Sequence, residues 1–163
     1  MRMEQVVLQT ETFETNEITT LLQAIDKDIP YELESLVYYP YYLFEYKIKA
    51  KGLMRLKGHI GCTIDAISGR GAMIDQKPSL YEGEIHEKNA LRPNLTMEAA
   101  LEKADEYLFH TASLKLKFLT MPKVELVNRK IFYRPYWIVT PADKNRGATK
   151  LIVDAVSGTY HPI

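Results

Sequence analysis

The stretch that decides the fold reads VYYPYYLF over residues 37–44, and it has a counterpart, FYRPYWIV, at residues 132–139. Further along each half, IDAISG at residues 64–69 is matched by VDAVSG at residues 153–158. The two motifs occur in the same order both times. Matched motifs in matched order predict that one structural unit is present twice in the chain.

An amphipathic helix is predicted ahead of each Tyr-Pro motif. Apolar residues recur at helical spacing within residues 18–25 and again within residues 97–108, as expected for a helix with one buried face. Pro30 should lie beyond the end of the first helix. The predicted N-caps are Thr15 or Asn16 in the first half and Thr96 in the second.

The rest of each half is predicted to form strands. Residues 36–48 are rich in Tyr, Phe and Val, and β-branched runs follow at 58–66 and 149–155. The sequence therefore predicts an α+β protein of two repeats, each a helix packed on an antiparallel β-sheet. The predicted boundaries are a first repeat at 1–75, a linker at 76–94 and a second repeat at 95–163.

The two Asp-Ala-x-Ser-Gly elements are predicted to be tight turns. The carboxylates of Asp65 and Asp154 can accept hydrogen bonds from amides two or three residues further on. Gly69 and Gly158 can supply the positive φ that such a hairpin turn requires. A turn role is the expected one, and no catalytic role is assigned to either aspartate.

A family resemblance rests on the second half. Leu95-Thr96-x-Glu98-x-Ala100 opens a helix, Val153–Gly158 leads into a short final strand, and the combination resembles the PepSY domain. The resemblance is best over residues 95–163 and weaker over residues 15–75. It implies a helix over an antiparallel hairpin, and a module that binds or inhibits proteases rather than an enzyme. PepSY domains are commonly extracytoplasmic, whereas this chain shows no export signal.

Composition and charge exclude several classes of function. Lys and Arg together number 21, as do Asp and Glu, so the chain has no global field that would attract nucleic acid or an acidic membrane. No apolar run approaches the roughly 20 residues of a membrane span, so no membrane insertion is expected. Cys62 is the single cysteine, which rules out an intramolecular disulfide and favours a cytoplasmic location.

A protein-binding surface is predicted on one face of the Tyr-Pro strands, because alternate side chains of a strand point to opposite faces. The face without charged residues should pack against the helix. Its members are Tyr38, Tyr42 and Phe44 in the first half, with Tyr133, Trp137 and Val139 in the second. The other face combines tyrosine with arginine, a composition favoured at protein interfaces. The predicted partner-binding residues are Tyr39, Tyr41, Arg134 and Tyr136.

A basic stripe gives the alternative function of nucleic-acid binding. No acidic residue interrupts it, and on a hairpin it could follow phosphates. The competing interpretation is a solvated hairpin whose lysines prevent edge-to-edge pairing. Its residues are Lys47, Lys49, Lys51, Arg55 and Lys57.

Catalytic, metal and cofactor sites are not predicted. The four histidines are scattered without metal-ligand spacing, and Cys62 shares the strand parity of Ile60 and Ile64, as a small buried residue would. We therefore expect a non-catalytic binding or regulatory module with a protein or peptide partner. Association with a second copy, and an enzyme with a cleft between the repeats, stay open as alternatives.

Overall fold

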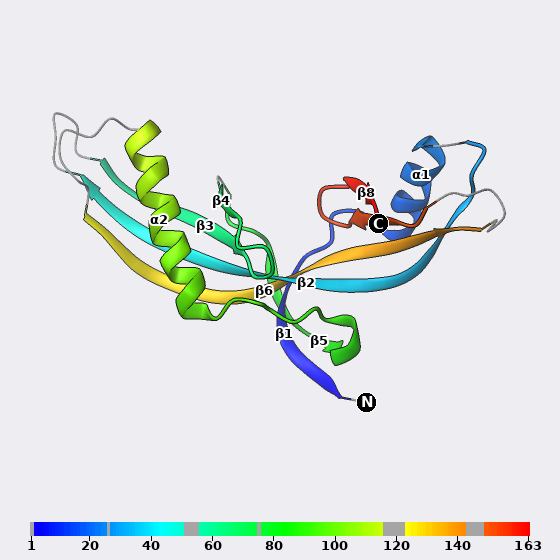
Figure 1. Cartoon of the computed structure of the whole chain (residues 1–163), viewed down its shortest axis with the longest axis horizontal. Helices are drawn as coiled ribbons and strands as arrows, with labels where there is room; N and C mark the ends of the chain where they lie inside the picture. Colours follow the sequence, from blue (N-terminus) through cyan, green and yellow to red (C-terminus); the bar gives the residue numbers. More distant parts are fainter. Residues whose placement is uncertain (1, 26, 51–55, 75, 116–122, 143–148) are drawn as a thin grey trace. The chain divides into compact units, whose positions relative to one another are not determined.

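Two long strands organise the structure, a computed structural model that describes residues 2–25, 27–50, 56–74, 76–115, 123–142 and 149–163. Strand β2 (Tyr31–Ala50) has 20 residues and strand β6 (Lys123–Pro141) has 19. The Tyr-Pro motif lies near the middle of β2 and in the second half of β6. Within the described residues they are neighbours in a mostly antiparallel sheet of eight strands, and Figure 1 shows them with the helices that accompany the sheet. The predicted α+β class is confirmed at this level.

The remaining elements are shorter. The strand order in the sheet is β4-β3-β2-β6-β1-β5, with β7 paired to β6 and β8 paired to β7. The other strands are β1 (Met3–Gln9), β3 (Leu56–Asp65), β4 (Gly71–Ile74), β5 (Leu80–His86), β7 (Leu151–Asp154) and β8 (Tyr160–Pro162). The helices are α1 (Thr15–Ile25), α2 (Met97–Lys115) and the short 3-10 helix η1 (Glu87–Asn89).

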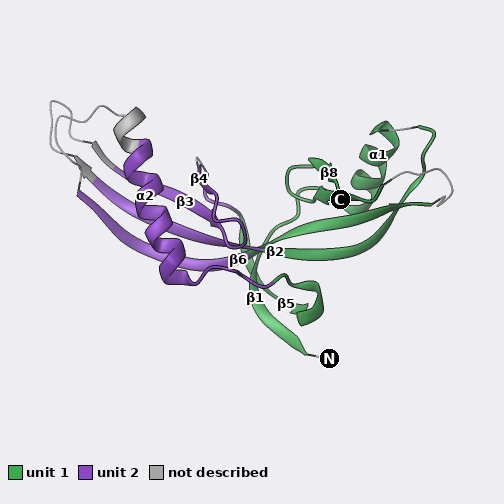
Figure 2. Cartoon of the chain, viewed as in Figure 1, with its two compact units in different colours: residues 1–39, 79–91, 133–163 green, residues 40–78, 92–132 purple. Residues whose placement is uncertain are grey.

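The chain forms two compact units, neither of which is a continuous segment (Figure 2). Unit 1 contains residues 1–39, 79–91 and 133–163, and unit 2 contains residues 40–78 and 92–132. Strands β2 and β6 each contribute residues to both units, and β2 passes from unit 1 to unit 2 at Pro40.

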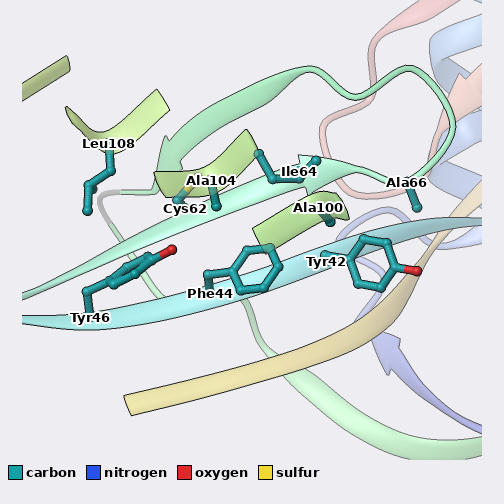
Figure 3. Packing of buried hydrophobic residues seen from close by; sticks show 9 residues of the cluster. All are labelled: Tyr42, Phe44, Tyr46, Cys62, Ile64, Ala66, Ala100, Ala104 and Leu108. Atoms are coloured by element: carbon teal, nitrogen blue, oxygen red, sulfur yellow. The ribbon is translucent and has the colours of Figure 1, made fainter. Parts of the chain in front are cut away.

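Unit 2 packs α2 against β2 and β3. Tyr42, Phe44 and Tyr46 are every second residue of β2, so their side chains all point to the face that packs against the helix, as Figure 3 shows. Small residues on α2 let the helix approach this face closely. The buried cluster contains Tyr42, Phe44, Tyr46, Cys62, Ile64, Ala66, Ala100, Ala104 and Leu108.

Unit 1 packs α1 against β7 and the end of β6. Ile18 and Leu22, one turn apart on α1, are almost completely buried, as the helical spacing predicts. The buried cluster of this unit contains Ile18, Leu22, Val139, Leu151, Val153 and Ala155. Trp137 packs against this cluster.

Tyr42 and Phe44 therefore face a helix, as do Trp137 and Val139, as predicted. Tyr38 and Tyr133, predicted on the same faces, belong to neither buried cluster and pair with Ala90 and Leu8 instead.

Each helix packs on strands from the other half of the sequence, which differs from the predicted arrangement. The helix at 15–25 contacts the hairpin around residues 151–155, and the helix at 97–115 contacts the hairpin around residues 42–66. The predicted repeats, 1–75 and 95–163, therefore do not coincide with the compact units. An apolar stripe shows that a helix buries one face, but it does not show which of two similar sheets covers that face.

Residues 76–94, predicted as a linker, contain β5 and η1. Strand β5 pairs with β1 in an antiparallel ladder that runs from Met3 opposite His86 to Gln9 opposite Leu80. Pro78 and Gly83 suggested a connecting segment, but pairing with the distant strand β1 supplies the backbone hydrogen bonds of this segment.

Helix α1 begins one residue earlier than predicted. The carbonyl oxygen of Glu14 accepts the Ile18 N–H at 3.0 Å, so Glu14 is the N-cap in place of Thr15 or Asn16. For α2 the predicted N-cap is confirmed, because the Thr96 hydroxyl oxygen accepts the Ala99 N–H at 3.2 Å.

Candidate functional site

The two predicted turns have nearly the same geometry. Asp65 Oδ1 accepts the N–H groups of residues 67 and 68 at 2.8 and 2.9 Å. Asp154 Oδ1 accepts those of residues 156 and 157 at 2.8 and 3.3 Å. Gly69 and Gly158 close the turns with φ of 78° and 76°, a conformation in which a side chain would be strained. The four residues have the geometry of structural turns.

Each turn also forms backbone hydrogen bonds with the segment that precedes a helix. The carbonyl oxygen of Ala66 accepts the N–H groups of Asn94 and Leu95, just before α2. The carbonyl oxygen of Ala155 accepts the N–H groups of residues 12 and 13, just before α1. These bonds fix where each helix begins above its sheet. They also account for the alanine in each motif, because a buried methyl group leaves room for the incoming chain.

The prolines of the Tyr-Pro motifs lie where a hairpin ladder ends. Tyr41 pairs with Asp65 and Tyr136 pairs with Asp154, and each proline precedes that last paired residue. The carbonyl oxygens of Pro40 and Pro135 accept the N–H groups of the turn alanines, each at 3.1 Å. A proline is tolerated inside these long strands because the ladder needs no donor at that point.

The predicted tyrosine surface consists largely of side chains that pack against one another. In unit 1, the rings of Tyr39 and Tyr136 meet edge to face with centroids 5.8 Å apart. In unit 2, Tyr41 stacks on Phe132 at 5.7 Å. All three tyrosines are half-buried. Aromatic pairs of this kind stabilise a sheet face, so a binding role for these residues stays a prediction.

Arg134 is tied to the second turn. Its guanidinium lies 2.7 Å from Asp154 Oδ2 and donates to Oδ1 at 3.1 Å, and only a quarter of the arginine side chain is exposed. Asp154 is itself buried, with 7% of its surface exposed. This charge-assisted pair gives Arg134 a structural task that the sequence did not suggest.

The basic stripe is described only in part. Lys51 and Arg55 lie outside the described residues, and Lys49 and Lys57 are described by their backbone positions alone. The β2–β3 register places Lys49 opposite Lys57 and Lys47 opposite His59.

Strand β6 brings further charge to the same part of unit 2. Lys47 and Lys123 line an open hollow of about 320 Å³ together with Val124 and Glu125. Neither lysine forms an ion pair with any other residue in the described part of the chain. Sequence reasoning missed Lys123, because only the pairing of β6 with β2 brings it beside the stripe.

The titratable groups of the unit 2 core are held neutral. The Tyr46 hydroxyl donates to Asp105 Oδ1 at 2.9 Å, and burial together with this bond raises the pKa of Tyr46. Burial raises the pKa of the Cys62 thiol to about 11. A thiol that keeps its proton at neutral pH is a poor nucleophile, in agreement with the predicted packing role of Cys62.

Within the ranges that the structure describes, no three His, Cys, Asp or Glu side chains gather in a way that could hold a metal ion. In those same ranges, no helix has both the length and the apolarity that crossing a membrane requires. No protein-family model matches the chain, and no curated protein or solved structure matches it either.

Proposed function

We propose that this protein is a non-catalytic binding module that accepts an extended segment of a protein partner as an added β-strand. The accepting site is the outer edge of β6 in unit 2, over residues 123–131. The observation that carries the proposal is that β6 has β2 on one side there, while no described strand pairs with its other side. Figure 1 shows this part of β6, drawn in yellow, on the outside of β2. An open edge offers unpaired backbone groups to an incoming strand.

Two other sheet edges are short, and the β6 edge differs from the edge at the start of β2 by its exposed valines rather than by a lack of charge, since Lys123, Glu125, Arg129 and Lys130 lie on it. Strand β4 has four residues and β8 has three, and short edge strands offer little to pair with. The edge at the start of β2 exposes Glu32, Glu34 and Ser35, and charged residues discourage edge-to-edge pairing. On β6, in contrast, Val124 and Val127 are exposed to 41% and 43%.

The proposal includes a duplicated, PepSY-like origin for the chain. Its support is the matched geometry of the two turns, of the two prolines and of the two helix attachments. Two single-residue parallel pairings add to this: Leu8 pairs with Tyr133, and Ala90 pairs with Tyr38. In each case one partner lies upstream of a helix and the other lies two residues before the proline of a Tyr-Pro motif. The exchange of helices between the halves is what fusion of two copies that had swapped this element would produce.

Strand addition is tested with a probe that can pair only through its backbone. The probe is a capped peptide of alternating threonine and valine, about eight residues long, because strands of that length are common. Added to isotope-labelled full-length protein, it should shift the amide signals of residues 123–131 and slow their hydrogen exchange. A fully N-methylated copy has no backbone donors, and it should do neither.

A matched pair of variants locates the edge. Val127→Lys places a charge on the β6 edge and should weaken the binding of the peptide, because lysine protects edges from pairing. Ser35→Lys makes the same kind of change on the exposed edge of β2 and should leave binding unchanged. Signals that move only outside residues 123–131, or equal binding of the N-methylated peptide, would overturn the proposal.

A further inference from the structure

The edge of β6 lies beside several basic side chains that form no ion pair within the described residues. Lys123 is on the accepting strand, and Lys47 is on the adjacent strand β2 at the same hollow. Lys47 belongs to the face opposite α2, because its neighbour Tyr46 is in the buried cluster under the helix. Lys123 belongs to the same face, because Leu126, three residues further along β6, packs against that cluster. Arg129 and Lys130 follow on β6. Over residues 123–130 of that strand, Glu125 is the single acidic residue.

From this arrangement we infer that the added strand is an acidic one, with carboxylates alternating with apolar residues. The inference rests on the proposed function and specifies its ligand. A strand added to β6 lies about 5 Å from β6 and about 10 Å from β2. Glutamate and lysine side chains can together span both distances, so carboxylates on one face of the peptide can reach Lys123 and Lys47. Val124 is on the other face of β6 and provides apolar contact for the alternate residues.

The basic character of this surface supports an anionic partner. Lys47 and Lys123 line the same hollow, and neither forms an ion pair within the described residues. A bound carboxylate supplies the opposite charge that these two side chains lack. Local enrichment of opposite charge also accelerates association at low salt.

Peptide is favoured over nucleic acid by the aromatic residues nearby. Proteins that bind single strands usually offer exposed aromatic rings on which bases stack. Here Tyr42 and Tyr46 are buried with their hydroxyls hydrogen-bonded, and Tyr41 is stacked on Phe132. The neutral charge of the whole chain also supplies no long-range attraction for a polyanion.

The test uses three capped peptides of equal length in which valine alternates with glutamate, threonine or lysine. The glutamate peptide should bind the full-length protein about tenfold more tightly than the threonine peptide, a difference of about 1.4 kcal/mol. The lysine peptide should bind most weakly. Raising the salt concentration should weaken binding of the glutamate peptide and leave the threonine peptide nearly unchanged.

Charge variants assign the effect to residues. Lys47→Ala and Lys123→Ala should each reduce the affinity for the glutamate peptide by about two- to fivefold, the range expected of exposed ion pairs. Neither variant should alter binding of the threonine peptide. Lys88→Ala, an exposed lysine of η1 in unit 1, is the matched control and should bind like the unaltered protein.

The outcomes separate this inference from the proposed function. Equal affinity for the glutamate and threonine peptides, with signals moving at 123–131, overturns the acidic preference and leaves strand addition standing. Equal binding of a fully N-methylated glutamate peptide overturns strand addition. Tighter binding of a single-stranded or duplex oligonucleotide than of the glutamate peptide, lost in the two lysine variants, assigns the surface to nucleic acid and overturns the peptide inference.

Discussion

Units 1 and 2 contain the same kind of turn, but the contacts between the sheet and the helix differ between them. In unit 2 the hydroxyl of Tyr42 donates to the Leu95 carbonyl at 2.6 Å, and that of Tyr46 donates to Asp105. In unit 1 the residue two places after the proline is Trp137, and its indole nitrogen is buried with no hydrogen-bond acceptor among the described residues. Unit 2 therefore has polar bonds between sheet and helix at positions where unit 1 has apolar packing.

Unit 1 places its strong polar interaction at the turn. The ion pair of Arg134 with Asp154 joins β6 to the turn, and the position before the other proline is occupied by Tyr39. The shared features of the two units are thus the apolar pattern and the backbone bonds of the turn. The polar side-chain contacts differ, which indicates that they adjust stability rather than specify the fold.

The largest expected effect on stability comes from truncating one large buried side chain in the core of one unit at a time. Phe44→Ala in unit 2 should cost about 3–5 kcal/mol and Ile18→Ala in unit 1 about 2–5 kcal/mol, because each side chain is fully buried. Urea unfolding can be followed by circular dichroism and by the fluorescence of Trp137, the single tryptophan, which reports on unit 1.

We expect Phe44→Ala to lower the midpoint seen by circular dichroism more than the midpoint seen by fluorescence. Ile18→Ala should have the reverse effect. Equal displacement of both midpoints by both variants would contradict this and would mean that the units unfold as one cooperative body.

Both turn aspartates should contribute to stability. Asp154→Ala removes an acceptor for two amides and leaves Arg134 without its carboxylate, so a cost of about 3 kcal/mol is expected. For Asp65→Ala, the loss of the acceptor for two amides should by itself cost about 1–2 kcal/mol. Chemical denaturation measures both. A double-mutant cycle with Arg134→Met isolates the ion pair, and a loss for Asp154→Ala that is the same with and without Arg134 would contradict its contribution.

The smallest effect appears at alkaline pH and, between pH 8 and pH 10, should come mainly from unit 2. Burial raises the pKa of Cys62 from 9.0 to about 11, so above pH 9 the unfolded chain loses a proton that the folded chain keeps. Stability from this group is complete below pH 9 and declines toward pH 11, with about 1 kcal/mol lost by pH 10. The raised pKa values of Tyr46 in unit 2 and of Tyr38 in unit 1 act in the same direction at higher pH.

The measurement is the free energy of unfolding by circular dichroism at several values between pH 8 and pH 10, where tyrosines contribute least. In Cys62→Ala the decline above pH 9 should be smaller than in the unaltered protein. The fluorescence transition of unit 1 serves as the internal control. An identical pH dependence in both proteins would show that the thiol is not the group responsible.

Local chemistry made part of the site predictable. The turn roles of Asp65, Gly69, Asp154 and Gly158 followed from residue type and spacing, because Asx turns and positive-φ glycines depend on a few neighbouring residues. The burial of Cys62 followed from strand parity in the same way. The ion pair between Arg134 and Asp154 could not be predicted in this way, because the two residues are 20 positions apart and meet only once β6 and β7 are in register.

The sequence by itself determined the two helices, the Tyr-Pro strands with their hairpin partners and the two turns, because these depend on periodicity and on local hydrogen bonding. Only the tertiary structure decided which helix covers which hairpin, because two similar amphipathic helices and two similar sheets can be matched in either way. It also decided that Lys123 lies beside Lys47, since long-range strand pairing carries no signature in either segment alone.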